Sequence, residues 1–373
     1  MVARRGLTAG IVLTAALALS GACKPAEPAA QSAPASVQPA ATAPAAAPAP
    51  SQPTAPPQVE TLRGGVLAST TDAGIFIAQD LGYFREQGIE LDLSTFDSAA
   101  RMVAPLGAGQ LDIGAGAHSA GLNNAISRGV NIKLIADKGS ATPGHGFQAL
   151  VFRKELVDSG QLRSPADLRG RRVAVSARGI TVEVALATWL RRAGLSMDDV
   201  EPVEMGFPDQ VNAIGNGSLD ATISIEPFLT RIVDLNVGTI YQRTDELIPG
   251  YQVAEVFYAG QFMREQPDVA RRFMVAYLKG VRYYNDAFDK GDAAKRQETI
   301  NILTRNTTVK DAALYDRMVM PGLAPDGHLN VASISEDQDY FLAAGLQQQR
   351  IDINTLIDHS FADAAVQALG PYQ

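Results

Sequence analysis

The sequence predicts an α/β protein whose globular part, from about Thr61 to Gln373, forms two similar lobes. Short apolar segments with strand-like patterns alternate with helix-like segments along this length, which is typical of α/β folds. A Gly-x-Leu-Asp sequence also occurs twice where a predicted helix turns into a predicted strand, at Gly109–Asp112 and Gly217–Asp220. Either one supersecondary plan is used in each of two lobes, or two short loops coincide. The length of the segment suits two lobes.

The N-terminal residues predict export. Arg4 and Arg5 precede an apolar stretch, Leu7–Leu19, which is shorter than the about 20 residues that span a bilayer. This arrangement is typical of a signal peptide, which we assign to residues 1–22. A membrane-anchoring helix is the alternative interpretation. The arginine pair leaves open whether export uses the Sec or the twin-arginine route.

A lone cysteine follows the apolar stretch. Ser20-Gly21-Ala22-Cys23 resembles the lipobox of bacterial lipoproteins, although Ser20 stands where a leucine is usual. Cys23 is the only cysteine in the chain, which excludes an intrachain disulfide and a cysteine-based metal site. The sequence therefore predicts lipidation at Cys23 and anchoring to the cell envelope, facing the periplasm or the cell exterior.

Residues 23–60 predict a disordered tether. Ten of the 21 prolines lie between Pro25 and Pro57, where Val37 is the only large apolar residue. Such a segment cannot bury enough apolar surface to offset the entropy of ordering. Proline-rich chain instead acts as an extended spacer of about 3.1 Å per residue.

The order of the predicted elements fits the two-lobe plan. For the first lobe we expect strands over residues 65–69, 89–93, 110–113 and 130–136, and helices over 73–81, 98–107 and from 118. A strand over 148–152 follows, and for the second lobe we expect strands over 171–175 and 218–221, and helices over 181–193, 208–215 and from 226. These strand–helix–strand successions predict parallel sheets. A strand over 251–258 would return the chain to the first lobe, and the chain from residue 267 is predicted to be mostly helical.

Four segments occur in order along the globular part, namely Asp80–Leu91, Gly109–Gly114, Asp167–Val175 and Gly217–Pro227. Together they resemble the nitrate/sulfonate/taurine/thiamine-pyrimidine family of periplasmic solute-binding proteins of ABC transporters. The resemblance implies a type II periplasmic binding protein fold, in which two doubly wound α/β lobes joined by a two-strand hinge close over a ligand. Lobe 1 would comprise residues 61–150 and 256–373, and lobe 2 residues 151–255.

The resemblance also implies a function. Such a protein captures a small-molecule ligand between its lobes and delivers it to an ABC transporter permease. It would be a monomer without catalytic activity, cofactor or metal. The hinge strands are expected near Leu150–Phe152 and Val253–Phe257.

Ligands of open α/β sheets bind outside the carboxyl ends of the strands. In this sequence those positions carry short polar side chains and predicted helix starts, which suit an anion or an oxygen-rich group. The candidate ligand-binding residues are Thr70, Thr71, Asp72, Ser98, His118, Ser119, Ser176, Arg178, Thr181 and Glu226. Arg178 is the only cation in these loops and would pair with a carboxylate or sulfonate.

Each candidate also has a structural interpretation. Three hydroxyl residues can act as helix N-caps, namely Ser98, Ser119 and Thr181. Arg178 can be a solvated loop residue, His118 can pack at a lobe edge, and Glu226 can stabilise a helix start through the dipole. The charge of the ligand stays open too, because an aromatic or neutral ligand would suit a cleft lined by Phe76, Phe207, Phe228 and Tyr258.

Other function classes lack their sequence signatures. The four histidines, His118, His145, His328 and His359, do not have metal-ligand spacing. Neither a nucleophile elbow nor a phosphate loop occurs, and a net charge of -8 without a basic patch argues against nucleic acid. Two alternatives remain, an enzyme similar to thiamine-pyrimidine synthase and a ligand-sensing receptor lobe. The first lacks the cysteine-rich motif of that branch, and no transmembrane helix or signalling domain follows for the second.

Overall fold

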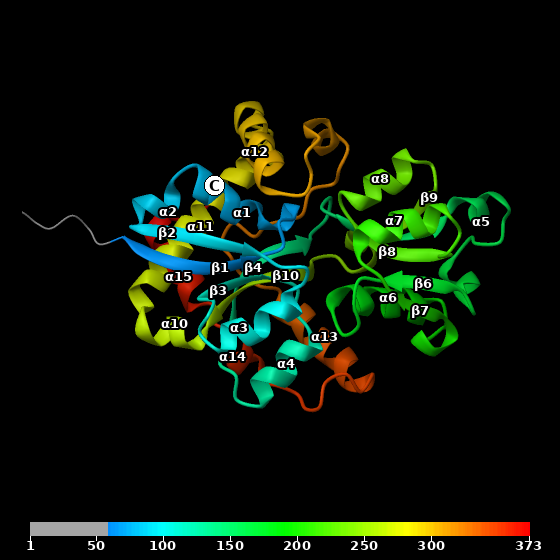
Figure 1. Ribbon diagram of the computed structural model, residues 1–373, viewed down its shortest axis with the longest axis horizontal. Helices are drawn as coiled ribbons and strands as arrows, with labels where there is room; N and C mark the ends of the chain where they lie inside the picture. The colour runs from blue at the N-terminus through cyan, green and yellow to red at the C-terminus, as the bar shows by residue number, and fades with distance from the viewer. Residues whose placement is uncertain (1–58) are drawn as a thin grey trace, which may run out of the picture. The chain divides into compact units, whose positions relative to one another are not determined.

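The computed structural model describes residues 59–373, so the predicted signal peptide, the lipobox and nearly all of the predicted tether lie outside the described residues. The described part contains two five-stranded sheets, each flanked by helices (Figure 1). The predicted α/β class with two lobes is confirmed. Among residues 59–373, no helix combines the length and the apolar character that crossing a membrane requires.

The first sheet has the strand order β2-β1-β3-β10-β4. Its strands are β1 (Glu60–Val66), β2 (Ile89–Thr95), β3 (Ile113–Gly116), β4 (Ile132–Ala141) and β10 (Tyr251–Ala259). β1 is parallel to β2 and β3, whereas β10 is antiparallel to β3 and β4. The prediction of a parallel sheet is therefore wrong for this side of the sheet, because β10 arrives from the other lobe and enters in the opposite direction.

The second sheet repeats this arrangement in the order β7-β6-β8-β5-β9. Its strands are β5 (Gln148–Arg153), β6 (Arg172–Val175), β7 (Glu201–Glu204), β8 (Ala221–Ile225) and β9 (Gly238–Arg243). β6 is parallel to β7 and β8, and β5 is antiparallel to β8 and β9. Position by position, β6, β7 and β8 correspond to β1, β2 and β3.

Helices flank each sheet (Figure 1). Those that precede β4 or follow β10 are η1 (Thr70–Asp72), α1 (Ala73–Asp80), α2 (Tyr83–Glu86), η2 (Ala99–Met102), α3 (Val103–Gly107), α4 (Ala120–Ser127), α10 (Gly260–Glu265), α11 (Pro267–Phe288), α12 (Ala293–Asn306), η5 (Ala312–Asp316), α13 (Val331–Ala343), α14 (Ile353–Leu356) and α15 (Ser360–Leu369). Those between β5 and β10 are α5 (Lys154–Asp158), η3 (Pro165–Leu168), α6 (Thr181–Arg192), η4 (Met197–Asp199), α7 (Phe207–Gly215), α8 (Phe228–Asp234) and α9 (Thr244–Leu247). The predicted helices over 73–81, 181–193 and 208–215 are confirmed to within a residue or two.

The repeated Gly-x-Leu-Asp turn has the same structural role in both lobes. Asp112 accepts a hydrogen bond from the backbone N–H of Arg63 at 2.8 Å and from the Arg63 guanidinium. Asp220 accepts one from the backbone N–H of Arg172 at 3.0 Å, and Arg153 Nη2 lies 3.0 Å from it. Each aspartate thus fixes the neighbouring strand, β1 or β6. The two turns are one supersecondary plan used twice and not a coincidence.

A close helix contact stabilises lobe 1. A Cβ on Gly280 of α11 would lie 2.2 Å from the carbonyl oxygen of Gly74 in α1, so only glycine allows this approach. α11 also buries Phe273 and Tyr277 against the sheet, and Tyr258 of β10 packs edge-on against Phe273 at 5.8 Å. The long C-terminal helix is thereby fixed to the first sheet.

The chain passes between the lobes twice. Ala141 at the end of β4 and Tyr251 at the start of β10 pack in the hydrophobic cluster of the second sheet, whereas Val256 packs in that of the first. The first crossing lies between β4 and β5 and thus before the expected hinge at Leu150–Phe152, because β5 belongs wholly to the second sheet. Phe341 of α13 also packs in the second cluster, so the C-terminal segment contacts both lobes.

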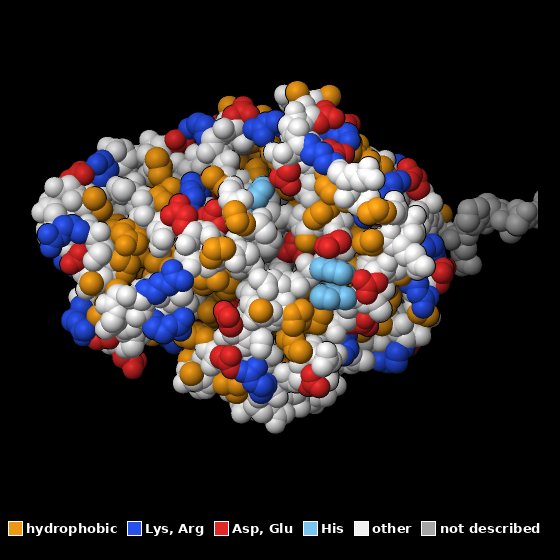
Figure 2. All heavy atoms as spheres, turned by 180° about the vertical axis from the view of Figure 1, so that it is seen from behind, with side chains coloured by type: hydrophobic (Ala, Val, Ile, Leu, Met, Phe, Trp, Pro, Cys, Tyr) orange, Lys and Arg blue, Asp and Glu red, His pale blue; other side chains and the backbone are white. Residues whose placement is uncertain are grey.

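Charged side chains are distributed over the surface. Figure 2 shows Lys, Arg, Asp and Glu side chains interspersed on the face opposite to that of Figure 1, with apolar side chains between them. On this face, side chains of one charge sign do not form a continuous area. A basic surface of the kind that nucleic acids require is therefore not visible there.

Candidate functional site

The carboxyl ends of the parallel strands in both sheets face a cleft between the lobes. The loop after β3 and the start of α6 meet across it, where the Ala120 N–H donates to the Gly179 carbonyl at 2.8 Å. Ser119 forms an isolated β-bridge with Ile180 at the same place. The hydroxyl oxygen of Tyr251 in β10 lies 3.0 Å from the Thr181 carbonyl and 2.9 Å from Asp337 Oδ1, and its one proton is donated to one of these two acceptors at a time. The lobes are in contact at the position where ligands of α/β sheets bind.

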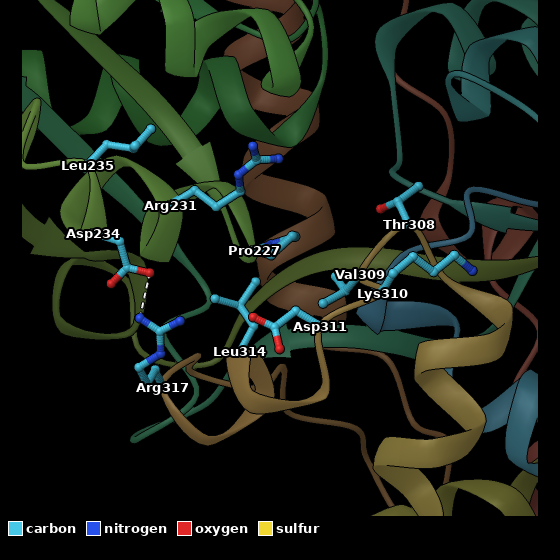
Figure 3. A pocket seen from close by; sticks show the side chains of 10 residues that line it. All are labelled: Pro227, Arg231, Asp234, Leu235, Thr308, Val309, Lys310, Asp311, Leu314 and Arg317. Carbon is cyan, nitrogen blue, oxygen red and sulfur yellow. Dashed lines mark hydrogen bonds and ion pairs between the residues drawn. The ribbon is translucent and has the colours of Figure 1, made fainter.

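A cavity of about 340 Å³ lies between α8 and the segment 308–317. Figure 3 shows Pro227 and Arg231 on the α8 side and Lys310 and Asp311 on the other, with Arg317 reaching Asp234. The Arg317–Asp234 ion pair of 2.6 Å joins the two lobes at its rim. The Thr308 N–H donates to the Ala68 carbonyl at 3.1 Å, so the cavity adjoins the loop that follows β1.

A second cavity, of about 500 Å³, lies between α6 and α13. Its lining includes Thr188 and Arg191 from α6, and Asp337 and Tyr340 from α13. Tyr251 lines it as well, so this cavity reaches the second hinge crossing. The C-terminal segment therefore borders the space between the lobes on both sides.

The residues after β1 contribute the carboxylate of a buried ion pair with β4. Thr70, Thr71 and Asp72 are buried in η1, where Asp72 Oδ2 accepts the Ser69 N–H at 2.9 Å. Lys138 of β4, which is completely buried, places its Nζ 3.0 Å from Asp72 Oδ1 and 2.7 Å from Thr71 Oγ1. A buried ammonium group is tolerated only when it is paired in this way. Two of the predicted residues are thus brought together by a lysine that the sequence analysis did not single out.

His118 and Ser119 lie in the loop after β3. Ser119 caps α4 by accepting the Leu122 N–H at 3.1 Å, as one of the two interpretations predicted. His118 is completely buried, with Nε2 2.9 Å from Asn123 Oδ1 and Nδ1 3.7 Å from Asp337 Oδ2. Burial raises the pKa of Asp337, although its contact with His118 and the Tyr251 hydroxyl opposes this.

The predicted cation of lobe 2 has a protein partner. Arg178 Nε lies 2.7 Å from Oε1 of the completely buried Glu183, which also accepts the Tyr340 hydroxyl at 2.9 Å. Thr181 donates its hydroxyl to the Val253 carbonyl at 3.3 Å, so it contacts the hinge strand. The loop after β6 is therefore bound to the hinge and to α13.

Glu226 begins the turn into α8 and is buried. Its Oε2 accepts the backbone N–H and the hydroxyl of Thr230 at 3.0 and 2.7 Å. Its Oε1 lies 3.5 Å from Arg243 Nη1 and accepts the Val319 N–H at 3.4 Å. The carboxylate has the structural role at the helix start that one interpretation predicted, and it also connects the lobes.

Ser98 and Ser176 are half-buried after β2 and β6. Among the described residues, neither hydroxyl makes a hydrogen bond to another of the predicted residues. The predicted polar side chains after β1, β3, β6 and β8 therefore have hydrogen-bond or ion-pair partners in the protein. The hydroxyls of Ser98 and Ser176 have none among the predicted residues. Which of the ten candidates contact a ligand stays a prediction.

Sequence reasoning missed the charges within the strands. Asp137 and Lys138 follow the apolar residues of β4, and Glu255 lies within the apolar run of β10; all three are buried. Burial raises the pKa of Asp137 to about 6, against hydrogen bonds from the Ala324 N–H and the Gln252 amide. The signal was present, because a charge in an otherwise apolar strand is rarely buried without a partner or a function.

Glu255 differs from the other buried acids of the cleft. Neither of its carboxylate oxygens has a hydrogen-bond partner of ordinary geometry among the described residues. Burial, and then the negative charges of Asp337 and Asp137, raise its pKa well above the usual range, while the His118 N–H and the positive charge of Lys138 oppose this. A buried carboxylate without a partner is costly to the fold.

Comparison with known proteins identifies the family to which this architecture belongs. The model of the family described as NMT1/THI5 like matches residues 69–288, more than half of the chain. The chain belongs to the NMT1/THI5-like family. A Brucella abortus (strain 2308) protein named as a binding protein is 22% identical over 280 residues, covering 74% of this chain and 83% of its own.

Solved structures share the fold of this NMT1/THI5-like chain. The periplasmic nitrate-binding protein of Synechocystis PCC 6803 superposes with a TM-score of 0.70 at 15% identity, covering 84% of this chain and 90% of its own. The alkanesulfonate-binding protein of Xanthomonas axonopodis pv. citri, bound to MOPS, gives 0.64 at 16% identity over 81% and 99%. The resemblance found in the sequence and the periplasmic binding protein fold are both confirmed.

Proposed function

We propose that this NMT1/THI5-like protein is the solute-binding component of an ABC import system. The observation that supports the proposal most directly is the contact between the lobes. Buried polar groups at the carboxyl ends of both sheets meet around two hinge crossings, an arrangement that can enclose a small molecule between the lobes. The fold shared with nitrate- and alkanesulfonate-binding proteins supports the same function.

The ligand would lie among the loops that carry the ten predicted residues. A small organic molecule fits this proposal, and an anionic one has less support than the sequence analysis gave it. Arg178, the group expected to hold an anion, is paired with Glu183. An anionic ligand would therefore need to displace that pair or to use backbone N–H groups at helix starts.

The export and anchoring of the protein rest on its sequence. We place the lipid anchor at Cys23, with residues 23–60 as a tether to the lobes and a permease as the partner. Acyl chains contribute about 0.8 kcal/mol per buried CH₂ group, and two or more chains anchor stably. Cys23→Ser should therefore move the exported protein from the membrane to the soluble fraction. Recovery of the wild-type protein in the soluble fraction after export would contradict the assignment.

A ligand screen tests the binding function. A ligand that binds only the folded protein stabilises it by RT ln(1 + [L]/Kd), about 2.7 kcal/mol at a hundredfold excess over Kd. Thermal-shift measurements with sulfonates, carboxylates, nitrate, pyrimidines and aromatic acids should give a clear increase in Tm for one chemical class, with one ligand bound per chain. The same hits should be incubated with the protein and analysed for products. Turnover of a hit would favour the enzyme alternative within this family.

A further inference from the structure

Glu255 lies at the cleft edge of the first sheet. It is paired with Gly116, the last residue of β3, and the side chains of directly paired antiparallel residues point to the same face. A Cβ on Gly116 would lie 2.5 Å from Ala99 Cβ and 3.6 Å from Leu67 Cδ1. The Glu255 side chain is therefore directed toward the loops that follow β1 and β2, beside the loop of His118. This is the carboxyl end of the parallel strands, where ligands bind.

The other buried carboxylates at the cleft each have a protein partner. Asp72 pairs with Lys138, Glu183 with Arg178, and Glu226 with Thr230 and Arg243. Asp337 accepts the Tyr251 hydroxyl at 2.9 Å. Glu255 is as deeply buried as these residues, yet neither of its oxygens makes a hydrogen bond of ordinary geometry to a described residue, although the backbone N–H of His118 acts on it.

The charges around Glu255 favour one class of ligand group. Three cations around the cleft, Lys138, Arg178 and Arg243, are each held by a carboxylate of their own, whereas Arg231 and Lys310 line the cavity beside α8. Asp337 and then Asp137 add negative charge around the buried Glu255, and Lys138 opposes them. A second negative charge here would be repelled, whereas a positive nitrogen group would form charge-assisted hydrogen bonds in a site of low dielectric constant.

We propose that Glu255 binds a positively charged nitrogen group of the ligand, such as an ammonium, an amidinium or a protonated aromatic amine. The inference rests on the proposed function and narrows its ligand class. Glu255 accepts hydrogen bonds from the cationic group at the base of the cleft. The rest of the ligand extends toward the loops of Ser98 and Ser176, whose hydroxyls make no hydrogen bonds to the other predicted residues.

Matched compounds test the charge preference. Benzamidine, benzamide and benzoate share one ring, and butylamine, butyramide and butyrate share one chain of four carbons, so the end group of each series changes from cationic through neutral to anionic. Both series are added to the thermal-shift screen, and the affinity of each hit is then measured by calorimetry. We expect the hits to carry a cationic nitrogen, and Glu255→Gln to weaken the best cationic hit by about 10- to 100-fold.

Two further variants separate recognition from folding. Glu90→Gln removes an exposed glutamate of β2 and should leave every affinity unchanged. Glu255→Gln should raise the Tm of the ligand-free protein, because it removes a buried acid that lacks a partner. Should Glu255→Gln fail to fold, Glu255→Asp keeps the charge and should keep the preference for cations while weakening their binding.

The outcomes distinguish the inference from the function on which it rests. A neutral or anionic hit that Glu255→Gln binds as tightly as the wild-type protein overturns the role of Glu255 and leaves the binding function intact. The absence of a hit in every chemical class counts against the binding function itself. Cationic hits that lose affinity in Glu255→Gln but not in Glu90→Gln support the inference.

Discussion

The two lobes share a strand plan but differ in where they place charge. In both sheets the aspartate of Gly-x-Leu-Asp accepts a hydrogen bond from a backbone N–H of the neighbouring strand. Asp112 binds β1 in this way, and Asp220 binds β6. Lobe 1 buries Lys138, Asp137 and Glu255 inside its strands. In lobe 2 the cation that pairs with the buried Glu183, Arg178, is 39% exposed. The repeated residues maintain the scaffold, and the unrepeated ones carry the chemistry of the cleft.

The largest expected effect comes from the buried cation of lobe 1. Lys138→Met leaves Asp72 buried without its partner, and breaking a buried ion pair costs about 3–5 kcal/mol. Arg178→Met is the matched variant in lobe 2 and should cost about 1 kcal/mol, because solvent screens the exposed arginine. Urea denaturation measures both. Equal costs would show that the lobes do not differ in the way that the burial of these cations indicates.

The repeated aspartates should respond alike. Asp112→Asn and Asp220→Asn each weaken hydrogen bonds to an arginine and to a backbone N–H, and we expect losses of about 1–3 kcal/mol. The two sites share no partners, so the losses should add in the double variant to within about 0.5 kcal/mol. Chemical denaturation of the three variants checks this. A large effect at only one site would mean that the turn is not equivalent in the two lobes.

The pH dependence of stability should differ between one acid of lobe 1, Asp137, and one acid of lobe 2, Asp199. The folded-state pKa of Asp137 is raised from 3.8 to about 6, so its contribution is fully present below about 3.8 and is lost as the pH rises through about 6. The expected loss is on the order of 3 kcal/mol, because each of about two pKa units corresponds to about 1.4 kcal/mol. Asp137→Asn should flatten the stability profile between these pH values.

Lobe 2 supplies the opposite case. The Ser196 N–H, followed by its hydroxyl, lowers the pKa of Asp199, so the stability from this group is present above its unfolded pKa and is lost as the pH falls. Asp199→Asn should therefore alter only the acid side of the profile. Denaturation curves recorded from pH 3 to 8 would distinguish the two variants, and identical profiles would contradict the contrast.

The smallest expected effect is at the rim of the cleft. Arg317 and Asp234 join the lobes through an ion pair whose side chains are 50% and 38% exposed. Arg317→Ala should change the free energy of unfolding by about 0–1 kcal/mol, and the change should decrease at high salt. Denaturation at low and high ionic strength measures it. A loss of several kcal/mol would show that this exposed ion pair, and not the buried contacts at the hinge, stabilises the contact between the lobes.

The sequence predicted the lobes because the signals for them are local. Apolar periodicity and glycines after helices marked most elements, and the repeated Gly-x-Leu-Asp indicated two similar sheets. The same reasoning located the loops after β1, β3, β6 and β8, since residues that follow parallel strands share one edge. It did not reveal the direction of β10 or the packing of Phe341 with lobe 2. Both depend on contacts between segments that are far apart in the sequence.

The sequence by itself determined the α/β class, the order of the elements and the set of polar loops that border the cleft. Only the tertiary structure decided which charges in and beside those loops are neutralised. Lys138 reaches Thr71 across 67 residues, and Tyr340 reaches Glu183 across 157. Electrostatic pairing depends on distance in space and on exclusion from water, and neither is a property of neighbouring residues in a sequence. For that reason Arg178 stood out in the sequence, whereas Glu255 stands out in the fold.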